Sequence, residues 1–294
     1  MILETDIGGD PDDFFAICYL LNAGVNIKAI LVSPGHPYQV GLVRFICEYC
    51  GVNIPIGVSD PNKCHSTDYT GFHKKMIMTY GIPESQKSDG IGYEIAESIY
   101  KDDPNVTFLA IGPMKNLGEF MRRNPLIHIR KFYMQGGFIG YDCHTDPNIV
   151  RLPKFEGKTV CRSYNPGGDI EACKLLTRTY VDDRRFISKN VNHTILFDSA
   201  KYAEMLSVWE GRTPEAPYEL FLKAAVAYDF QKREKKFHDP TAVACLLHPE
   251  VATWAEGQLY YTSQGWGFSV GQTGSRITTS VNYSKLWEYI MEGN

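Results

Sequence analysis

The chain has 294 residues and a formal net charge of −4. This length exceeds the ~100–200 residues of an average domain, but α/β proteins often run past ~250 residues as one unit. No basic run marks a nucleic-acid surface, and no stretch of about 18 apolar residues marks a membrane span. The first residues form a strand pattern rather than a signal peptide. These features predict a single domain over residues 1–294, with neither nucleic acid nor a membrane as a partner.

Cysteines are spread along the chain and bear on its compartment. Cys47 and Cys50 form a C-x-x-C pair, but they lie within a helical pattern, and no second pair stands at zinc spacing. Reduced, buried thiols are therefore the favoured interpretation. Because structural disulfides are rare in the cytosol, this usage indicates a cytoplasmic protein.

Short apolar runs alternate with amphipathic stretches along the chain. The predicted strands are 1–5, 27–33, 54–58, 106–111 and 131–134. The predicted helices include 12–22, 38–50, 114–123 and 170–176, a broken helical region over 205–237, and a C-terminal helix after further strands. Repeated strand–helix units predict an α/β fold with a doubly wound, mainly parallel sheet. Two long segments, 60–88 and 138–160, interrupt the pattern, and loops of this length often cover active sites.

Four aspartates lie within eight positions near the N-terminus, at 6, 10, 12 and 13. Asp6 ends the first predicted strand, and Asp12 and Asp13 begin the next helix after a glycine turn. In α/β proteins the carboxyl edge of the sheet is where ligands bind. Carboxylates held at one point repel one another unless a cation lies between them, and hard oxygen ligands suit Ca²⁺ or Mg²⁺. Helix capping accounts for one or two of these aspartates but hardly for four.

A second acidic position follows the charged run 231–236. Asp239 is predicted to cap the helix 241–247, with Pro240 at its first position. His238 precedes it, and a proton-active histidine beside a capping carboxylate could place a general acid next to a metal ligand. The alternative is a simple helix cap with an incidental histidine.

Two strand or turn positions could supply neutral ligands. Ile111 ends the strand 106–111 before Gly112-Pro113, so its carbonyl oxygen is free to bind a cation at the carboxyl edge. Asn165, in the turn Ser163-Tyr164-Asn165, could offer its amide to a sugar hydroxyl, although a turn asparagine more often has a structural role.

Together these motifs resemble those of the inosine–uridine-type nucleoside hydrolases in order and spacing. The family patterns D-x-D-P-G-x-D-D-A, G-P-L-T-N, M-G-G, E-F-N and H-D-P-x-A-V-A are similar to residues 4–13, 111–116, 134–137, 163–165 and 238–244. The resemblance extends over nearly the whole chain. It implies a nucleoside hydrolase-like, Rossmann-like core, a small-molecule nucleoside or nucleotide substrate, Ca²⁺ as cofactor, and a homodimer or homotetramer.

The resemblance also implies roles for individual residues. The implied metal ligands are Asp6, Asp13, Asp239 and the carbonyl oxygen of Ile111. Asp6 would also be the general base, and Asp12 would hold the ribose 2′-hydroxyl. Asn165 and Asp239 would hold the 3′-hydroxyl, and His238 would lie near the leaving base as a candidate acid. Such a site suits N-glycosidic cleavage, which passes through an oxocarbenium-like state that carboxylates stabilise.

Departures from the family pattern concern the sugar and its 5′ end. Glu4 stands where aspartate is usual, and His36 follows the second strand where an asparagine normally reaches the sugar. Ser163 and Gly157 replace the two residues that hold the 5′-hydroxyl. We therefore predict a modified or 5′-phosphorylated ribonucleoside, for example of the queuosine type. The basic residues that could meet a phosphate, unless they are solvated loop charges, are Arg151, Lys154, Lys158 and Arg162.

Aromatic residues close to His238 are candidates for stacking on the base. Tyr228 and Phe230 are the favoured pair, although core packing explains both equally well. Two other classes of function remain open. The altered 36, 157 and 163 positions are compatible with a catalytically silent riboside-binding or regulatory protein. The aspartate cluster superficially suggests a Mg²⁺ phosphohydrolase, but its supporting motifs are missing.

Overall fold

The computed structural model describes residues 1–60, 71–82, 86–143, 147 and 149–293. Ten strands form one sheet: β1 (Ile2–Thr5), β2 (Ala29–Val32), β3 (Ile56–Val58), β4 (Gly90–Ile91), β5 (Thr107–Ala110), β6 (His128–Gln135), β7 (Tyr180–Ile187), β10 (Ala252–Thr262), β11 (Gly265–Val270) and β12 (Ser275–Val281). A separate antiparallel pair consists of β8 (Leu196–Phe197) and β9 (Lys235–Lys236).

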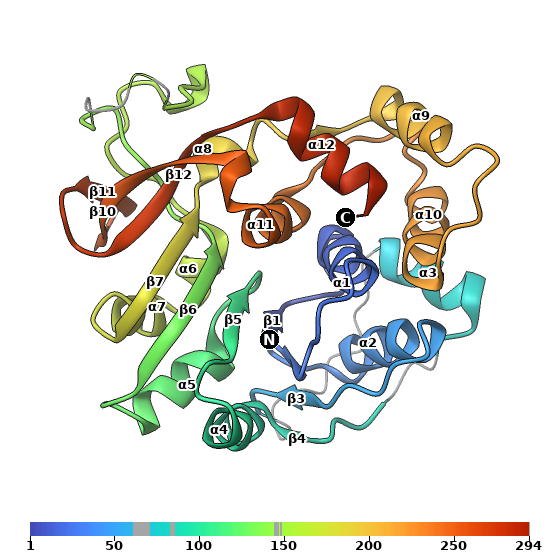
Figure 1. Cartoon of the computed structure of the whole chain (residues 1–294), viewed down its shortest axis with the longest axis horizontal. Coiled ribbons are helices and arrows are strands. Elements are labelled where there is room, and N and C mark those ends of the chain that lie inside the picture. The colour runs from blue at the N-terminus through green and yellow to red at the C-terminus, as the bar shows by residue number, and fades with distance from the viewer. Residues whose placement is uncertain (61–70, 83–85, 144–146, 148, 294) are drawn as a thin grey trace.

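The sheet order is β11-β10-β12-β7-β6-β5-β1-β2-β3-β4 (Figure 1). All neighbours from β4 to β12 run parallel, and only the β10 and β11 pairings are antiparallel. Leu3 of β1 pairs with Ile30 on one side and Leu109 on the other. This confirms the predicted doubly wound, mainly parallel α/β sheet. Strand order reverses at β1, so the crevice at its carboxyl end is the expected ligand site.

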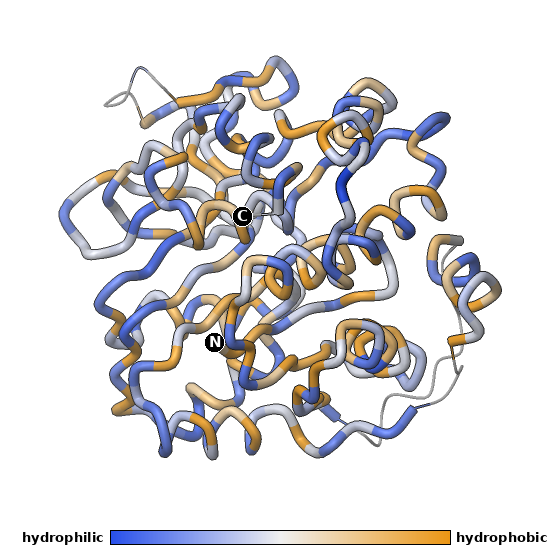
Figure 2. The backbone as a smooth tube through the Cα atoms, turned by 45° about the vertical axis from the view of Figure 1, so that its right-hand side comes forward, coloured by the Kyte–Doolittle hydropathy of each residue, from blue (hydrophilic) through white to orange (hydrophobic). Residues whose placement is uncertain are grey.

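The helices lie on both faces of the sheet (Figure 1). Their bounds are α1 (Asp12–Asn22), α2 (Pro37–Tyr49), α3 (Gly71–Tyr80), α4 (Gly92–Asp102), α5 (Lys115–Arg123), α6 (Tyr164–Gly168), α7 (Ile170–Leu176), α8 (Lys189–Asn192), α9 (Ser199–Val208), α10 (Ala216–Tyr228), α11 (His238–Leu247) and α12 (Tyr283–Glu292). Short 3₁₀ turns span Pro153–Phe155 and Pro249–Val251. One hydrophobic core lies under α1, α2, α10, α11 and α12, and a second lies under α4, α5 and α7. Figure 2 shows hydrophobic stretches concentrated in the central strands and the helices against them.

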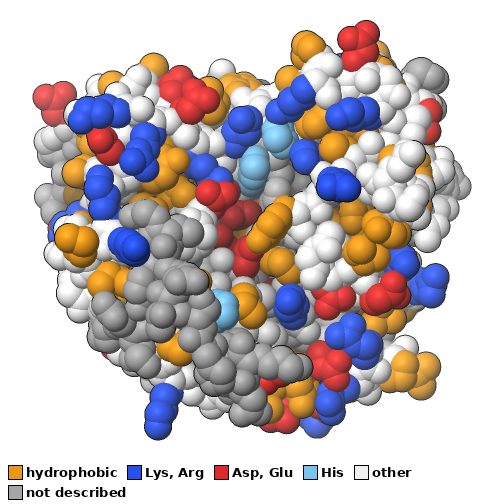
Figure 3. All heavy atoms as spheres, turned by 180° about the vertical axis from the view of Figure 1, so that it is seen from behind, with side chains coloured by type: hydrophobic (Ala, Val, Ile, Leu, Met, Phe, Trp, Pro, Cys, Tyr) orange, Lys and Arg blue, Asp and Glu red, His pale blue; other side chains and the backbone are white. Residues whose placement is uncertain are grey.

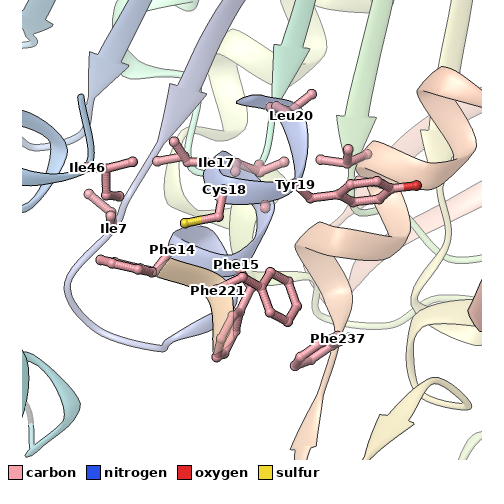
Figure 4. Packing of buried hydrophobic residues seen from close by; sticks show 14 of the residues in the cluster. Ile7, Phe14, Phe15, Ile17, Cys18, Tyr19, Leu20, Ile46, Phe221 and Phe237 are labelled. Atoms are coloured by element: carbon pink, nitrogen blue, oxygen red, sulfur yellow. The ribbon is translucent and has the colours of Figure 1, made fainter. Parts of the chain in front are cut away.

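Aromatic packing fixes the start of α1, which carries two of the aspartates. The Phe15 ring lies 4.6 Å from that of Phe221 and 5.2 Å from that of Phe237 (Figure 4). Phe14 meets Phe72 edge-on at 5.9 Å. Burial of each side chain of this size contributes roughly 1.5–3 kcal/mol to the stability of the fold. The first turn of α1 is therefore held rigidly against α10 and the segment that leads into α11.

Most of the predicted elements form, with boundaries shifted by a few residues. Helices 12–22 and 170–176 occur with the predicted limits as α1 and α7. The prediction that Asp239 caps α11 is wrong, because the helix begins at His238 and places Asp239 in its first turn. The described residues of the segment 138–160 are irregular apart from one 3₁₀ turn.

Other expectations fall partly outside the described residues. Within the segment 60–88, residues 71–80 form α3, whereas 61–70 and 83–85 lie outside the description. The described cysteines are free thiols, and Cys64 belongs to the residues not described. Across the described part of the chain, no helix has both the length and the apolar character that a membrane span requires.

Candidate active site

Three carboxylates meet at the carboxyl edge of the sheet. Asp12 and Asp13 come from the first turn of α1, and Asp239 from the first turn of α11. One carboxylate oxygen from each lies within 4.8 Å of the others, and all three side chains are buried. Two helix N-termini thus bring three carboxyl groups to one point, where the helix dipoles favour their ionised forms.

Asp6, at the end of β1, lines the same pocket, which has a volume of about 480 Å³. The lining residues are Asp6, Gly9, Asp10, Asp12, Asp13, Ile111, Gln135, Ser163, Tyr164, Asn165, Lys189, Asn192, His193, His238 and Asp239. In Figure 3 the acidic side chains lie within a hollow of the surface, with histidine side chains beside them. The structure therefore brings together the aspartates, Ile111, Ser163, Asn165 and His238, which come from distant parts of the sequence.

Crowding and burial oppose ionisation of these carboxylates. Burial, with the nearby charge of Asp12, raises the pKa of Asp6 to about 7. Burial also raises the pKa of Asp12 to about 6, although Lys235 partly offsets this. The pKa values of Asp13 and Asp239 are raised well above the usual range by burial and by the other carboxylates. A bound cation would reverse this balance, and an all-oxygen donor set fits a hard cation such as Ca²⁺ or Mg²⁺.

Asn165 connects two strand ends at the pocket. Its amide donates to the carbonyl oxygen of Ile111 at 2.6 Å and to Oε1 of Gln135 at 2.7 Å. Gln135 was not predicted as a site residue, although it ends β6 at the same carboxyl edge before Gly136-Gly137. Its position at the carboxyl end of a strand is the signal that could have identified it.

Glu4 lies behind the pocket and organises the strand ends around it. Its carboxylate accepts hydrogen bonds from Ser33 Oγ at 2.6 Å and from the backbone N–H groups of Asn116 and Leu117 at 2.8 and 2.9 Å. Burial raises its pKa to about 7. Glu4 thus connects β1 to the end of β2 and to the start of α5, and it is not among the described residues that line the pocket.

His238 stands beside the carboxylates without bonding to them. Its Nδ1 lies 4.0 Å from Asp12 Oδ2, beyond hydrogen-bond distance, and its ring lies 5.3 Å from that of His193. Burial and then the charge of Lys235 lower the pKa of His238 to about 3. His238 is therefore neutral near pH 7 in this site.

Lys235 is a cation that the sequence analysis did not place in the site. Its Nζ lies 2.7 Å from Asp10 Oδ2 and 3.3 Å from Asp12 Oδ1, and its side chain is 11% exposed. Burial opposes its charge, but Asp12 and Asp10 outweigh that cost and raise its pKa. Its place in the run of charged residues before His238 gave no local sign that it turns inward.

Three predicted substrate contacts are not among the described lining residues. His36 precedes α2, where its ring stacks on Tyr38 at 5.5 Å. Phe230 is fully buried against Phe197 at 4.4 Å, so the predicted stacking of Phe230 on a base is wrong for this conformation. Tyr228 packs on Phe230 at 4.7 Å, at the edge of the same aromatic cluster.

Ser163 and Gly157 stand where the family holds the 5′-hydroxyl, and they differ from each other in their position relative to the pocket. Ser163 lines the pocket, and its Oγ accepts a hydrogen bond from the backbone N–H of Gly137 at 3.2 Å. Gly157 has a φ of +71°, which favours glycine, and does not line the pocket among the described residues. Of the basic residues, Arg151 lies over the Tyr141 ring at 4.5 Å.

The fold is a doubly wound α/β sheet with a buried acidic pocket at its switch point, a typical ligand site of such folds, and the clustered carboxylates are a candidate metal site. The sequence profile of the inosine-uridine preferring nucleoside hydrolases matches residues 1–288, and the chain belongs to this family. It is thus an enzyme of the N-ribohydrolase class, acting on small nucleosides.

Solved structures share the fold at low sequence identity. A plant nucleoside hydrolase, PpNRh1, aligns with a TM-score of 0.71 and 15% identity over 99% of this chain and 97% of that chain. An inosine-uridine preferring nucleoside hydrolase from Bacillus anthracis gives 0.72 and 14% over the same shares. A purine-preferring ribonucleoside hydrolase from Gardnerella vaginalis gives 0.65 and 17% over 99% and 96%. No curated protein sequence matches the chain significantly.

Proposed function

We propose that this chain is a Ca²⁺-dependent hydrolase of the N-glycosidic bond of a ribonucleoside, which releases free base and ribose. The observation that carries this is the meeting of Asp12, Asp13 and Asp239 in a buried pocket of a nucleoside hydrolase fold. We further propose that residues 1–294 form one catalytic domain, that the protein is a cytoplasmic homodimer or homotetramer, and that Ca²⁺ is the resident metal.

The cation would be held by Asp6, Asp13, Asp239 and the carbonyl oxygen of Ile111. When bound, it would supply a Lewis acid that orients the ribose diol and acidifies water. Buried oxygen donors with raised pKa values support this donor set. Asp12 also lies beside this donor set, because one oxygen each from Asp12, Asp13 and Asp239 lie within 4.8 Å of one another.

The protein groups account for the remaining chemistry. Asp6 would accept the proton of the attacking water, and Asp12 would hold the ribose 2′-hydroxyl. Asn165 and Asp239 would hold the 3′-hydroxyl, while His238 would face the leaving base. The carboxylates would stabilise the positive charge that develops on the ribose ring as the glycosidic bond breaks.

The 5′ end of the substrate is proposed to be modified or phosphorylated, as in a nucleoside 5′-phosphate or a queuosine-type nucleoside. Ser163 supports this proposal because it is too short to replace a glutamate as an anchor. It lines a second cavity of about 700 Å³, which adjoins the acidic pocket through Asp6, Ser163, Tyr164 and Lys189. Arg162 lines this second cavity too and could meet a 5′ substituent.

The direct test is to incubate the purified protein with Ca²⁺ and a panel of ribonucleosides, 5′-nucleotides and modified nucleosides. Release of free base and reducing sugar is measured with and without a chelator. Chelator-sensitive release from one or more members supports the proposal, and the ranking identifies the preferred base and 5′ group. Binding of Ca²⁺ and ribosides without release would instead favour a catalytically silent riboside-binding protein.

A further inference from the structure

Three lysines lie near the ring pair His193–His238, and one of them, Lys189, lines the acidic pocket. Nζ of Lys154 contacts Nδ1 of His193. Lys189 lines the pocket, and its Nζ donates to the carbonyl oxygen of Arg162 at 2.7 Å. Basic side chains flank the histidines in the space-filling view (Figure 3).

The third lysine, Lys236, lies on β9, opposite Leu196 of β8. Burial, followed by the charges of Lys154, Lys189 and Lys236, lowers the pKa of His193, and burial, followed by Lys236 and Lys189, lowers the pKa of Lys154. The charges of Lys236 and Lys189 therefore repel the ammonium group of Lys154. Such repulsion is relieved when an anion binds among them.

Among the described residues, these charges lack a counter-ion. Within the described part of the chain, no carboxylate forms an ion pair with Lys154, Lys189 or Lys236. Lys235, next to Lys236 in the sequence, differs because Asp10 and Asp12 neutralise it. The pocket thus has a floor of carboxylates and a separate cationic rim.

The histidines add hydrogen-bond donors to this rim. Because the Lys154 ammonium donates to Nδ1 of His193, the ring proton of a neutral His193 resides on Nε2, which can donate to a ligand. Nε2 of His238 is buried and has no hydrogen-bond partner among the described residues. The Nε2 atom of each ring can therefore form a hydrogen bond with a bound group.

We propose that Lys154, Lys189 and Lys236, with His193, form an anion subsite, and that the substrate carries a phosphate or carboxylate outside its ribose diol. This inference rests on the proposed function, since it places the diol at the carboxylates. Two sources of the anion fit: a 5′-phosphate, or an acidic group on the base. Lys189 lines both cavities, so it lies within reach of either.

The test uses reaction products, so that it does not depend on turnover. Calorimetry on the Ca²⁺-loaded protein compares ribose with ribose 5-phosphate, and uracil with its 6-carboxylate, orotate. We expect one or both anions to bind at least tenfold more tightly than the neutral parent, because charge-assisted hydrogen bonds to lysine are strong. A preference for ribose 5-phosphate identifies a phosphate source, and a preference for orotate identifies an acidic base.

Variants assign the effect to the lysines. The double substitution Lys154→Gln with Lys189→Gln should abolish the preference, and the corresponding double Arg substitution should retain it. Lys232→Gln is the matched control, because Lys232 is exposed and lies 3.6 Å from Asp229. The proposal is overturned if neither anion is preferred, or if the preference survives the double Gln substitution. An anion preference in a protein that hydrolyses no riboside would reject the proposed function but keep the subsite.

Discussion

At the scale of single residues, the pocket is a place where like charges are held together. Asp12, Asp13 and Asp239 are almost fully buried, and among the described residues Lys235 is the cation that pairs with one of them. Buried carboxylates without a counter-ion are costly, and proteins keep such groups where they bind a cation or perform chemistry. The acidic floor is thus better explained by ligand binding than by stability.

The first prediction removes one oxygen ligand while preserving shape. Asp13→Asn should weaken Ca²⁺ binding by more than roughly 100-fold, since even residues behind metal ligands contribute 10–100-fold. Turnover should be lost in parallel. Calorimetry gives the affinity, and the hydrolysis assay gives the rate. Full turnover in a variant that no longer binds metal would refute the role of Ca²⁺.

The second prediction concerns the leaving base. His238→Ala should slow hydrolysis of natural nucleosides more than that of an activated p-nitrophenyl riboside, whose leaving group needs no assistance. The low pKa of His238, about 3, means that the wild-type ratio of the two rates should not change between pH 6 and 8. Rate profiles of the two substrates test both statements. Equal losses on both substrates would remove His238 from contact with the leaving base.

At the scale of helices and strands, close approach of two strand ends places Asp6. A Cβ atom at Gly112, just after β5, would lie 2.5 Å from the backbone nitrogen of Asp6 and 2.8 Å from its Oδ1. Real Cβ atoms do not approach so closely, so a larger residue must displace the end of β1 or β5. The glycine is therefore a geometric requirement of the pocket.

The third prediction follows from this contact. Gly112→Ala should lower Ca²⁺ affinity roughly tenfold or more, because overpacking against backbone forces a shift that costs about 1–3 kcal/mol. Gly271→Ala is the matched control, because a Cβ at Gly271 meets nothing within 4 Å and the residue does not line the pocket. Calorimetric titration of both variants with Ca²⁺ measures the difference. Similar affinities in the two would show that the strand ends tolerate movement.

The same scale explains what could be predicted from the sequence. The strands β1, β2, β3 and β5 were found because each is a short apolar run, as expected for strands covered on both faces. Strand β7 was missed because its sequence, Tyr180–Ile187, holds four consecutive charged residues. These charged side chains find polar partners in the fold. Arg184 donates a hydrogen bond to Ser275 Oγ at 2.8 Å, and Arg185 forms an ion pair with Asp183 at 2.8 Å. Such partners come from distant or alternate positions and leave no local pattern.

For the site, local motifs predicted the acidic residues but not their neighbours. Asp6, Asp12 and Asp13 have few structural uses in that spacing, so their sequence was informative. The sequence around Phe230 and Lys235 was not informative. An aromatic residue or a lysine near His238 can face the core, the pocket or the solvent, and the local sequence does not distinguish these positions. Tertiary packing decided each case: Phe230 joined the aromatic core, and Lys235 turned toward Asp12.

At the scale of the whole molecule, the pocket joins the two ends of the chain. Asp6 and Asp13 belong to the N-terminal β1–α1 unit, and Asp239 belongs to α11 near the C-terminus. A cation bound between them favours the folded state by mass action, by about 2.7 kcal/mol at 100 times its Kd. Stability of the whole fold should therefore report on the site.

The titratable groups of the protein determine the pH range in which its free energy of unfolding depends on the site. Buried carboxylates with raised pKa values, such as Asp6 at about 7, bind protons more tightly when folded, so they reduce stability as pH rises. Buried histidines with lowered pKa values, such as His73 at about 4 and His193 at about 3, act in the opposite sense, and this contribution fades only between about pH 6.5 and 7.5, where unfolded histidines lose their protons. Because the pKa values of Glu4, Asp6, Asp13 and Asp239 are all raised, the carboxylates outweigh the histidines above pH 6.5.

The fourth prediction is that, between pH 6.5 and 8, the metal-free protein becomes less stable as pH rises. A loss of about 1 kcal/mol, or about 2–4 °C in Tm, is expected from a carboxyl with a pKa near 7. Saturating Ca²⁺ should reduce this slope, because the cation stabilises the ionised carboxylates of the pocket, although Glu4 behind the pocket keeps its contribution. Asp13→Asn should lose the Ca²⁺ effect. Calorimetric scans at several pH values, with Ca²⁺ or with chelator, measure both slopes. A metal-free Tm that rises with pH across this window would show that the clustered aspartates already ionise freely, and the electrostatic argument for a cation site would fail with it.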